Sequence, residues 1–198
     1  NLDKHVKNLQ SFGQTVVIAF NKFATDTDEE IEVLRKHCEE MGCGFAVNSA
    51  FAEGGNGAIE LANLVVKTID ERPSAPLYYA YDDNDSVEEK IEKVAFNLYG
   101  AGSVTLSDSA KAMIEEIKKL GAEKFPICIA KTQYSFSTDA KAYGPTEGFE
   151  LHVRDITVNM GAEMVVVIAG PIMRMPGLPK SPQAERIDVV NGEITGLS

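Results

Sequence analysis

The amino-acid sequence predicts an α/β fold, with parallel-sheet βαβ units in the first half and a more β-rich, loop-rich C-terminal part after it. Residues 15–20 form a short apolar run rich in β-branched side chains, which is typical of a strand buried on both faces. An amphipathic helical pattern follows at 28–41, then a second strand pattern at 45–47 and a helical pattern at 58–69. Because strands separated by helices need crossover connections, we expect the sheet to be parallel.

The helical pattern at 58–69 carries a clear apolar stripe. Ile59, Ala62, Val66 and Ile69 recur at helical spacing, so we expect them to face the core. The prolines and the arginine that follow, between residues 71 and 76, end this helix.

The remaining elements follow in the order helix, helix, strand, strand, strand and hairpin. We expect helices at 86–99 and 107–120, strands at 126–130, 151–158 and 164–169, and a hairpin at 187–194 whose turn is Asn191-Gly192. These patterns divide the chain into an α/β, Rossmann-like part over residues 1–130 and a β-rich part over 131–198 that packs on the same domain.

Composition excludes several classes of protein. A net charge of −11 argues against a nucleic-acid binder, which would concentrate Lys and Arg. Cys38, Cys43 and Cys128 are too few and too far apart for a disulfide framework or a zinc site, so we expect free thiols in a reducing cytoplasm and no bound metal. No run of about 18 apolar residues is present, so we expect no membrane partner.

The first residues already follow a helical pattern. Leu2, Val6 and Leu9 recur at helical spacing before any strand. We therefore expect the chain to begin within a helix and to be a piece of a longer protein.

The first loop of unusual composition follows the strand expected at 15–20. It opens with Asn21-Lys22-Phe23, which resembles the Asn-Lys-x-Asp base-reading motif of GTPases, but Ala24 replaces the aspartate that would bind guanine. A helix N-cap explains the Thr and Asp residues of this loop. It does not explain Phe23, an aromatic residue among polar neighbours.

The second loop follows the strand expected at 45–47. It reads Phe51-Ala-Glu-Gly-Gly-Asn-Gly57, and its glycines allow close approach of the backbone to a ligand or positive φ angles. It lacks the Gly-Lys-Ser/Thr of a phosphate-binding loop, and such a stretch is more often a plain turn. Because Phe23 and Phe51 follow neighbouring strands, the two rings could hold a flat heterocycle between them, each stack contributing about 0.5–1.5 kcal/mol beyond area burial.

The third loop, at 131–137, directly follows the strand expected at 126–130. Lys131, Thr132 and Gln133 bring a cation, a hydroxyl and an amide to the mouth of the sheet, although a plain solvated loop is an equal alternative. No histidine is assigned a catalytic role, and no serine–histidine–acid set stands out.

These motifs together resemble the C-terminal part of formate–tetrahydrofolate ligases. The resemblance covers the whole chain and is carried by Asn21-Lys-Phe-x-Thr-Asp-Thr27, Phe51-Ala-Glu-Gly-Gly-x-Gly57, Lys131-Thr-Gln-Tyr-Ser-Phe-Ser137, Met175-Pro-Gly-Leu-Pro179 and the closing Gly196-Leu197. It implies an ATP-dependent ligase that activates formate as formyl phosphate and passes the formyl group to N10 of tetrahydrofolate. It further implies ATP with Mg²⁺, a monovalent cation such as K⁺ or NH₄⁺, a homotetramer, and a phosphate-binding loop in an N-terminal part that is absent here.

The resemblance also implies roles for individual residues. Phe23 matches the family's aromatic residue on one side of the folate ring, and Phe51 stands where the family has a tryptophan on the other side. The folate-binding set is then Phe23, Phe51, Gly54, Gly55 and Gly57, with Asn21, Lys131, Thr132 and Gln133 as candidate lining residues. Arg174, where the family usually has threonine, and residues 142–148, which lack its usual Gly-Arg-Pro order, are further departures.

Two other hypotheses remain open at this point. The chain could be a non-catalytic α/β module that binds partner subunits, which its acidic surface allows. The loop of Asn21 and Phe23 could instead meet adenine, by analogy with the base-reading loop of GTPases.

Overall fold

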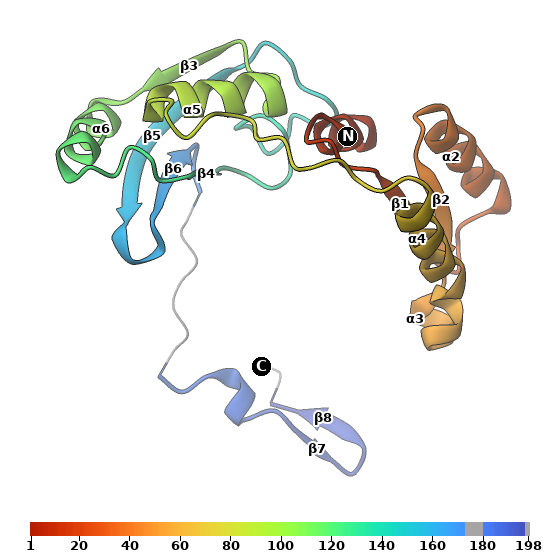
Figure 1. The fold of residues 1–198 in the computed structure, drawn as a ribbon. Helices are drawn as coiled ribbons and strands as arrows, with labels where there is room; N and C mark the ends of the chain where they lie inside the picture. Colours follow the sequence, from red (N-terminus) through yellow and green to blue (C-terminus); the bar gives the residue numbers. More distant parts are fainter. Residues whose placement is uncertain (173–179, 197–198) are drawn as a thin grey trace.

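The computed structural model describes residues 1–172 and 180–196, and it has the predicted α/β character (Figure 1). The α-helices are α1 (Leu2–Ser11), α2 (Asp28–Glu40), α3 (Ala50–Glu53), α4 (Ile59–Glu71), α5 (Val87–Val94) and α6 (Asp108–Leu120). The strands are β1 (Val17–Asn21), β2 (Gly44–Asn48), β3 (Ser103–Leu106), β4 (Ile127–Ala130), β5 (Glu150–Asn159), β6 (Met164–Ala169), β7 (Asp188–Val190) and β8 (Glu193–Thr195). Short turns of other helix types lie at Gly54–Ala58, Ala95–Tyr99, Met160–Ala162 and Gln183–Glu185.

The first lobe is a two-stranded parallel sheet, β1–β2, with helices on both faces. On one face α1 and α2 share a core, in which Val6, Ile31 and Cys38 pack with Phe45 of β2. On the other face α4 approaches so closely that a Cβ atom added to Gly44 would lie 3.3 Å from a methyl carbon of Leu64. The crossover from β1 through α2 to β2 is the predicted βαβ unit.

The second lobe is a four-stranded mixed sheet in the order β3-β5-β6-β4. β3 and β5 are parallel, β4 and β6 are parallel, and β5 and β6 are antiparallel. The lobe has one core, made by α5, α6 and the inward side chains of the strands, among them Ile91, Ile114 and Leu151. β3 and β4 precede residue 131 and β5 and β6 follow it, so strands from both sides of that position share one sheet.

The sequence patterns did not predict β3, and they did not separate the two sheets. β3 has four residues, of which only Val104 and Leu106 are apolar, and it lies at an edge of its sheet. A short edge strand of this kind lacks the hydrophobic pattern by which buried strands are recognised.

The expected inner face of α4 is wrong. Val66 and Ile69 are 60% and 62% exposed, and Ile59 and Ala62 are exposed as well. The side of α4 nearest the sheet carries Leu61, Leu64 and Thr68, of which Thr68 is buried. The helix thus has two apolar sides, and periodicity cannot tell which of them meets the sheet.

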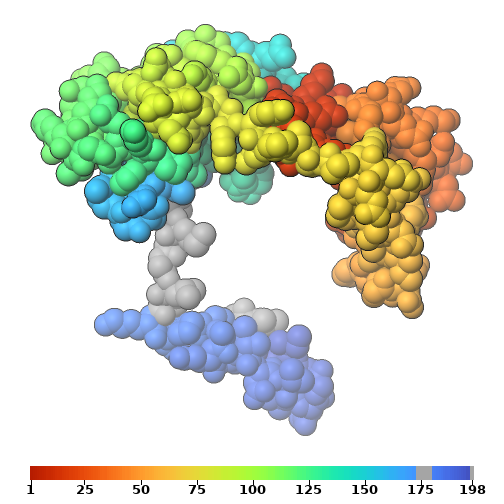
Figure 2. Space-filling view, in the orientation of Figure 1, coloured from red at the N-terminus to blue at the C-terminus, as the bar shows by residue number. Residues whose placement is uncertain are grey.

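α1 lies between the two lobes (Figure 2). While Val6 belongs to the core of the first lobe, Lys4 Nζ donates to Asn97 O at 3.2 Å and Asn8 Nδ2 donates to Leu98 O at 2.9 Å, both in the turn Ala95–Tyr99 that follows α5. The His5 ring lies 4.8 Å from that of Phe136, in the loop after β4.

The predicted hairpin is present as β7–β8, and Asn191 and Gly192 both have positive φ angles, as a tight hairpin turn requires. No helix in the described part of the chain is long and apolar enough to cross a membrane.

Candidate functional site

The candidate site is built on the carboxyl ends of β1 and β2. The register pairs Asn21 with Asn48 at the last position of both strands. Their side chains are joined, because Asn48 Nδ2 donates to Asn21 Oδ1 at 2.8 Å, and the backbone N–H of Lys22 donates to Asn48 O at 3.0 Å. The loops that carry Phe23 and Phe51 therefore leave the same edge of the sheet side by side.

The loop after β1 is a tight turn that presents Phe23 to solvent. The Asp26 carboxylate accepts from the Phe23 N–H at 2.7 Å, and the Asp26 N–H donates to Phe23 O at 3.2 Å. Thr27 and Glu30 then cap α2 reciprocally, and these hydrogen bonds from Thr27 lower the pKa of the Glu30 carboxyl. The polar residues of the loop serve its own folding, whereas the Phe23 ring remains 66% exposed.

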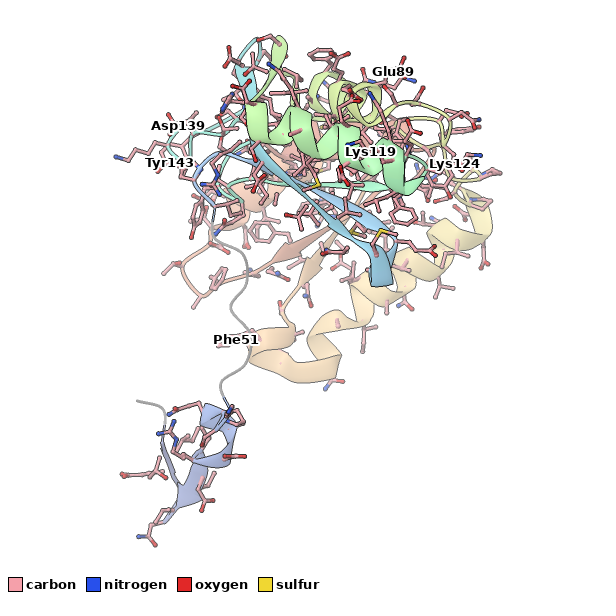
Figure 3. All side chains as sticks on the ribbon, turned by 90° about the vertical axis from the view of Figure 1, so that its left-hand side faces the viewer. Phe51, Glu89, Lys119, Lys124, Asp139 and Tyr143 are labelled. Carbon is pink, nitrogen blue, oxygen red and sulfur yellow. The ribbon has the colours of Figure 1, made fainter. Side chains whose placement is uncertain are left out.

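The loop after β2 presents Phe51 in the same way. The Ser49 carbonyl accepts from the N–H groups of Ala52 and Glu53, both at 3.0 Å, so residues of the expected glycine-rich loop fold into the single turn of α3. Phe51 lies on this turn, points away from the rest of the lobe and is 99% exposed (Figure 3).

The three glycines of this loop differ in what they require. Gly54 has φ +61°, a conformation that L side chains rarely adopt. A Cβ atom on Gly57 would lie 2.5 Å from the backbone carbonyl carbon of Ser49, whose N–H donates to Gly57 O at 3.0 Å. Gly55 has neither a positive φ nor a neighbour within 4 Å of such a Cβ atom. Neither backbone conformation nor packing within the described residues requires glycine at position 55.

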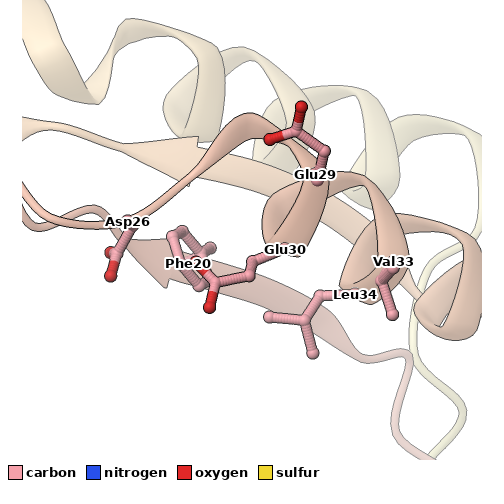
Figure 4. A pocket seen from close by; sticks show the side chains of 6 residues that line it. All are labelled: Phe20, Asp26, Glu29, Glu30, Val33 and Leu34. Carbon is pink, nitrogen blue, oxygen red and sulfur yellow. The ribbon is translucent and has the colours of Figure 1, made fainter.

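A cavity of about 510 Å³ opens beside the Phe23 loop, between β1 and the first turns of α2 (Figure 4). Its floor is apolar and its rim is acidic; the lining side chains are Phe20, Asp26, Glu29, Glu30, Val33 and Leu34. No sequence pattern marks this cavity, because Phe20 and Leu34 have the spacing of ordinary core residues.

The third loop lies elsewhere. Lys131 follows β4, which belongs to the four-stranded sheet, so Lys131, Thr132 and Gln133 do not leave the same sheet edge as Phe23 and Phe51. The expectation that all three loops surround one mouth is corrected in this respect. The cause is topological, since the strand pattern at 127–130 pairs with β6 rather than with β1 or β2.

The Lys131 side chain holds its own loop together. Its ammonium donates to the carbonyl oxygens of Thr132 and Ser135 and lies 4.8 Å from the centre of the Tyr99 ring. Burial lowers the pKa of Lys131. A small cavity of about 160 Å³ lies here, lined by residues 131–136 together with Asn1, His5 and Tyr99.

The remaining sequence motifs carry little of the site. His37 pairs with Asp3 at 2.7 Å and His152 Nδ1 lies 2.9 Å from Thr105 Oγ1, so both histidines have structural neighbours. Arg174, the Met-Pro-Gly-Leu-Pro string at 175–179 and Leu197 lie outside the described residues.

Comparison with known proteins agrees with the motifs. The family model for formate–tetrahydrofolate ligase matches residues 1–198. The formate–tetrahydrofolate ligases of Bacteroides fragilis and Phocaeicola vulgatus are 64% and 65% identical over 198 residues, which is 100% of this chain and 36% of each relative. That of Campylobacter curvus is 47% identical over 201 residues, again 36% of its length. The chain thus spans about a third of the relatives it matches, and it belongs to the formate–tetrahydrofolate ligase family.

Proposed function

We propose that this chain is the part of a formate–tetrahydrofolate ligase that positions tetrahydrofolate for formylation. The observation that carries the proposal is the bridge between Asn48 and Asn21, which sets two exposed aromatic residues at one sheet edge. Phe23 and Phe51 would lie against the two faces of the flat ring. Because Gly54, Gly55 and Gly57 have no side chains, the ligand could approach the backbone of the second loop closely.

Gly55 is the glycine that best supports a ligand at this position. Its conformation and its surroundings both leave room for a side chain. A ligand lying against the loop gives a reason for the missing Cβ atom that the loop itself does not supply.

The complete protein would join formate to tetrahydrofolate at the expense of ATP, as a cytoplasmic homotetramer that uses Mg²⁺ and a monovalent cation such as K⁺ or NH₄⁺. The residues present here do not fit the triphosphate of ATP with its Mg²⁺. The sequence has no Gly-Lys-Ser/Thr loop, and in residues 1–172 and 180–196 no group of three or more His, Cys, Asp or Glu side chains could hold a metal ion. We assign the phosphate chemistry to the N-terminal part of the longer protein.

In this proposal the chain orients tetrahydrofolate, which accepts the formyl group. In the proposed reaction the N10 lone pair attacks the carbonyl carbon of formyl phosphate, phosphate leaves with the electrons of the C–O bond, and the amine proton passes to the departing phosphate. Formyl phosphate is open to attack by water, so the acceptor has to be held in place before the intermediate forms. A folate ring held between Phe23 and Phe51 at the β1–β2 edge would keep the acceptor in place before formyl phosphate forms.

The candidate lining residues have subordinate roles in this proposal. Asn21 holds the two loops together through Asn48. Lys131, with Thr132, keeps the 131–137 loop folded, and the more exposed Gln133 is the member of this group whose side chain is free to reach a ligand.

A titration with a tetrahydrofolate analogue tests the proposal. Phe23→Ala should weaken binding on the order of 3- to 10-fold, the loss expected for one aromatic stack. Tyr143→Ala is the matched control, because Tyr143 is a similarly exposed aromatic residue on a loop of the other lobe (Figure 3) and should change nothing. Phe51→Trp should tighten binding, since indole offers a larger stacking face.

Equal affinities for wild type, Phe23→Ala and Phe51→Trp would contradict a folate site at this edge. That result would favour the alternative of a non-catalytic module. Displacement of the folate analogue by a nucleotide would assign the edge to adenine instead.

A further inference from the structure

We propose that the open edge of β1 accepts a further parallel β-strand, supplied by the part of the ligase polypeptide outside this chain, and that this strand connects to β1 through α1. The site would then lie at the carboxyl ends of three strands, with β1 in the middle. The placement of the strand does not depend on folate binding.

The edge itself carries a regular row of free backbone groups. The β1–β2 sheet has two strands, so no other strand of the described residues pairs with β1. Val16 O accepts from Gly44 N and Lys22 N donates to Asn48 O, which fixes the even-numbered residues as those that face β2. In a parallel ladder the alternate residues point the other way. Val17, Ala19 and Asn21 therefore present their N–H and C=O groups at the open edge.

The position of α1 determines where the preceding strand lies. α1 is on the same face as α2, because Val6 packs with Ile31 and Cys38, and Asp3 pairs with His37 at 2.7 Å. Crossovers between parallel strands are right-handed in almost every known case. In the crossover from β1 to β2, the helix α2 lies on this face and the chain shifts to one side of β1. Every right-handed crossover with its helix on this face shifts in the same direction. A strand that reached β1 through α1 on the same face must lie on the side of β1 away from β2.

The space at this edge is open on both faces. The cavity of about 510 Å³ on the α2 side has Phe20, Val33 and Leu34 among its lining residues, and a cavity of about 220 Å³ on the α4 side has Val17, Val65 and Ile69 among its own. Each cavity is lined by residues of β1 or of the turn before it, and neither by a residue of β2. Successive side chains of an added strand point to opposite faces and would enter these two apolar hollows in turn.

The parallel type of the sheet and the length of the related proteins indicate what pairs with the open edge of β1. Parallel sheets are stable when buried in larger layered structures, and two strands alone are marginal. This chain corresponds to 36% of the length of its relatives, so the longer polypeptide has ample sequence for another strand. A second copy of this chain related by a two-fold axis would place β1 against β1 antiparallel, which does not continue the parallel sheet.

Residue-resolved amide hydrogen exchange tests the proposal. The comparison is between this chain and a chimaera in which it replaces the matched region of the Bacteroides fragilis ligase. In the chimaera the Val17, Ala19 and Asn21 amides should exchange at least about 100-fold more slowly than in the chain by itself. The Ile18 and Phe20 amides, which face β2, should be protected in both and are the internal control.

A pair of substitutions keeps the test decisive even if the 198-residue chain does not fold by itself. In the chimaera Ala19→Pro removes an N–H that we assign to the new strand and should lower the melting temperature by about 5 °C or more, whereas Ala19→Ser keeps the N–H and should not. Equal melting temperatures for the two variants, or unchanged exchange at Val17 and Ala19, would overturn the proposal. Concentration-dependent protection of these amides in the short chain would overturn the assigned occupant in favour of a second copy.

Discussion

At the scale of single residues, Gly55 and Gly57 show that neighbouring glycines can meet different requirements. A Cβ atom at position 57 would lie 2.5 Å from the backbone of Ser49, and one at position 55 would meet nothing within 4 Å. The sequence shows both only as members of a glycine-rich run. Only the three-dimensional path of the backbone shows that the fold requires the glycine at position 57, whereas the glycine at position 55 leaves room for a ligand.

Alanine substitutions at the two positions should separate these roles. Gly57→Ala forces the Ser49 backbone to move and should lower the free energy of unfolding by about 1–3 kcal/mol. Gly55→Ala should stay within about 0.5 kcal/mol of wild type in urea denaturation. If Gly55→Ala weakens folate binding while leaving stability unchanged, its missing side chain serves the ligand. Equal destabilisation by both substitutions would contradict the assigned geometry.

Lys90 is a second residue whose role the sequence could not indicate. Its side chain is fully buried in the second lobe, where Nζ donates to Glu123 O at 2.7 Å and to Phe125 O at 3.2 Å. Burial lowers the pKa of Lys90 below its ordinary value of 10.5, and nearby carboxylates, Asp83 first among them, oppose that shift. In the sequence Lys90 is simply one charged residue on an amphipathic helix.

The pH dependence of stability should report this lysine. Between its lowered folded pKa and 10.5 the unfolded chain binds more protons than the folded one, so the free energy of unfolding rises with pH in that window. Lys90→Met leaves two carbonyl oxygens unpaired and should cost about 1–3 kcal/mol at neutral pH. The deficit of the variant relative to wild type should then grow as pH rises towards 10.5 in urea denaturation. A deficit that shrinks with pH would contradict the assigned sign.

At the scale of elements, α4 tests how far apolar periodicity can be trusted. Its stripe of Ile59, Val66 and Ile69 is regular, yet these side chains are 54%, 60% and 62% exposed, and Leu64 is the side chain that meets the sheet at Gly44. Leu64→Ala should lower the free energy of unfolding by about 2 kcal/mol, because it opens a gap against β2. Val66→Ala should change it by no more than about 0.5 kcal/mol. If urea denaturation shows that Val66→Ala destabilises the protein more than Leu64→Ala does, the stripe of Ile59, Val66 and Ile69 is the buried side of α4.

Most elements could be predicted from local patterns, because their caps and periods are local properties. The N-cap before α2, the helices that start after Ser86 and Ser107 and the Asn191-Gly192 turn all lie where the sequence indicated. Partner choice between strands is not local. Nothing within residues 127–130 indicates that they pair with β6, more than thirty residues later, and so the 131–137 loop was placed at the wrong sheet.

The candidate site was predictable to the same extent. Phe23 and Phe51 stood out as aromatic residues just after neighbouring strands, and the register of β1 and β2 places both at one edge. The Asn21–Asn48 bridge and the cavity beneath Phe20 depend on side chains that meet only in three dimensions, and no sequence pattern marks them. The folate roles of these residues stay predictions.

At the scale of the whole molecule, two separate cores are joined by α1. Val6 belongs to the first core, and the Asn8 amide bonds to the turn Ala95–Tyr99 after α5 in the second lobe. We expect calorimetry to show two unfolding transitions, with the lobe of the two-stranded sheet melting first because its core is smaller. Asn8→Ala should widen their separation by a few degrees.

Ser109→Ala is the control for this measurement. Its hydroxyl bonds to Asp155 within the second lobe, so its loss should shift the upper transition alone. A single transition whose calorimetric and van't Hoff enthalpies agree would show instead that α1 couples the lobes into one cooperative unit.

The strand order β3-β5-β6-β4 has a consequence for synthesis on the ribosome. β3 and β4 emerge first, but each can pair only with a strand made later, β5 or β6. Until residue 169 has left the exit tunnel, the apolar faces of α5 and α6 have no sheet to cover. The second lobe can therefore complete its sheet only after β6 has been made, and until then its apolar helix faces and unpaired strand edges are open to aggregation.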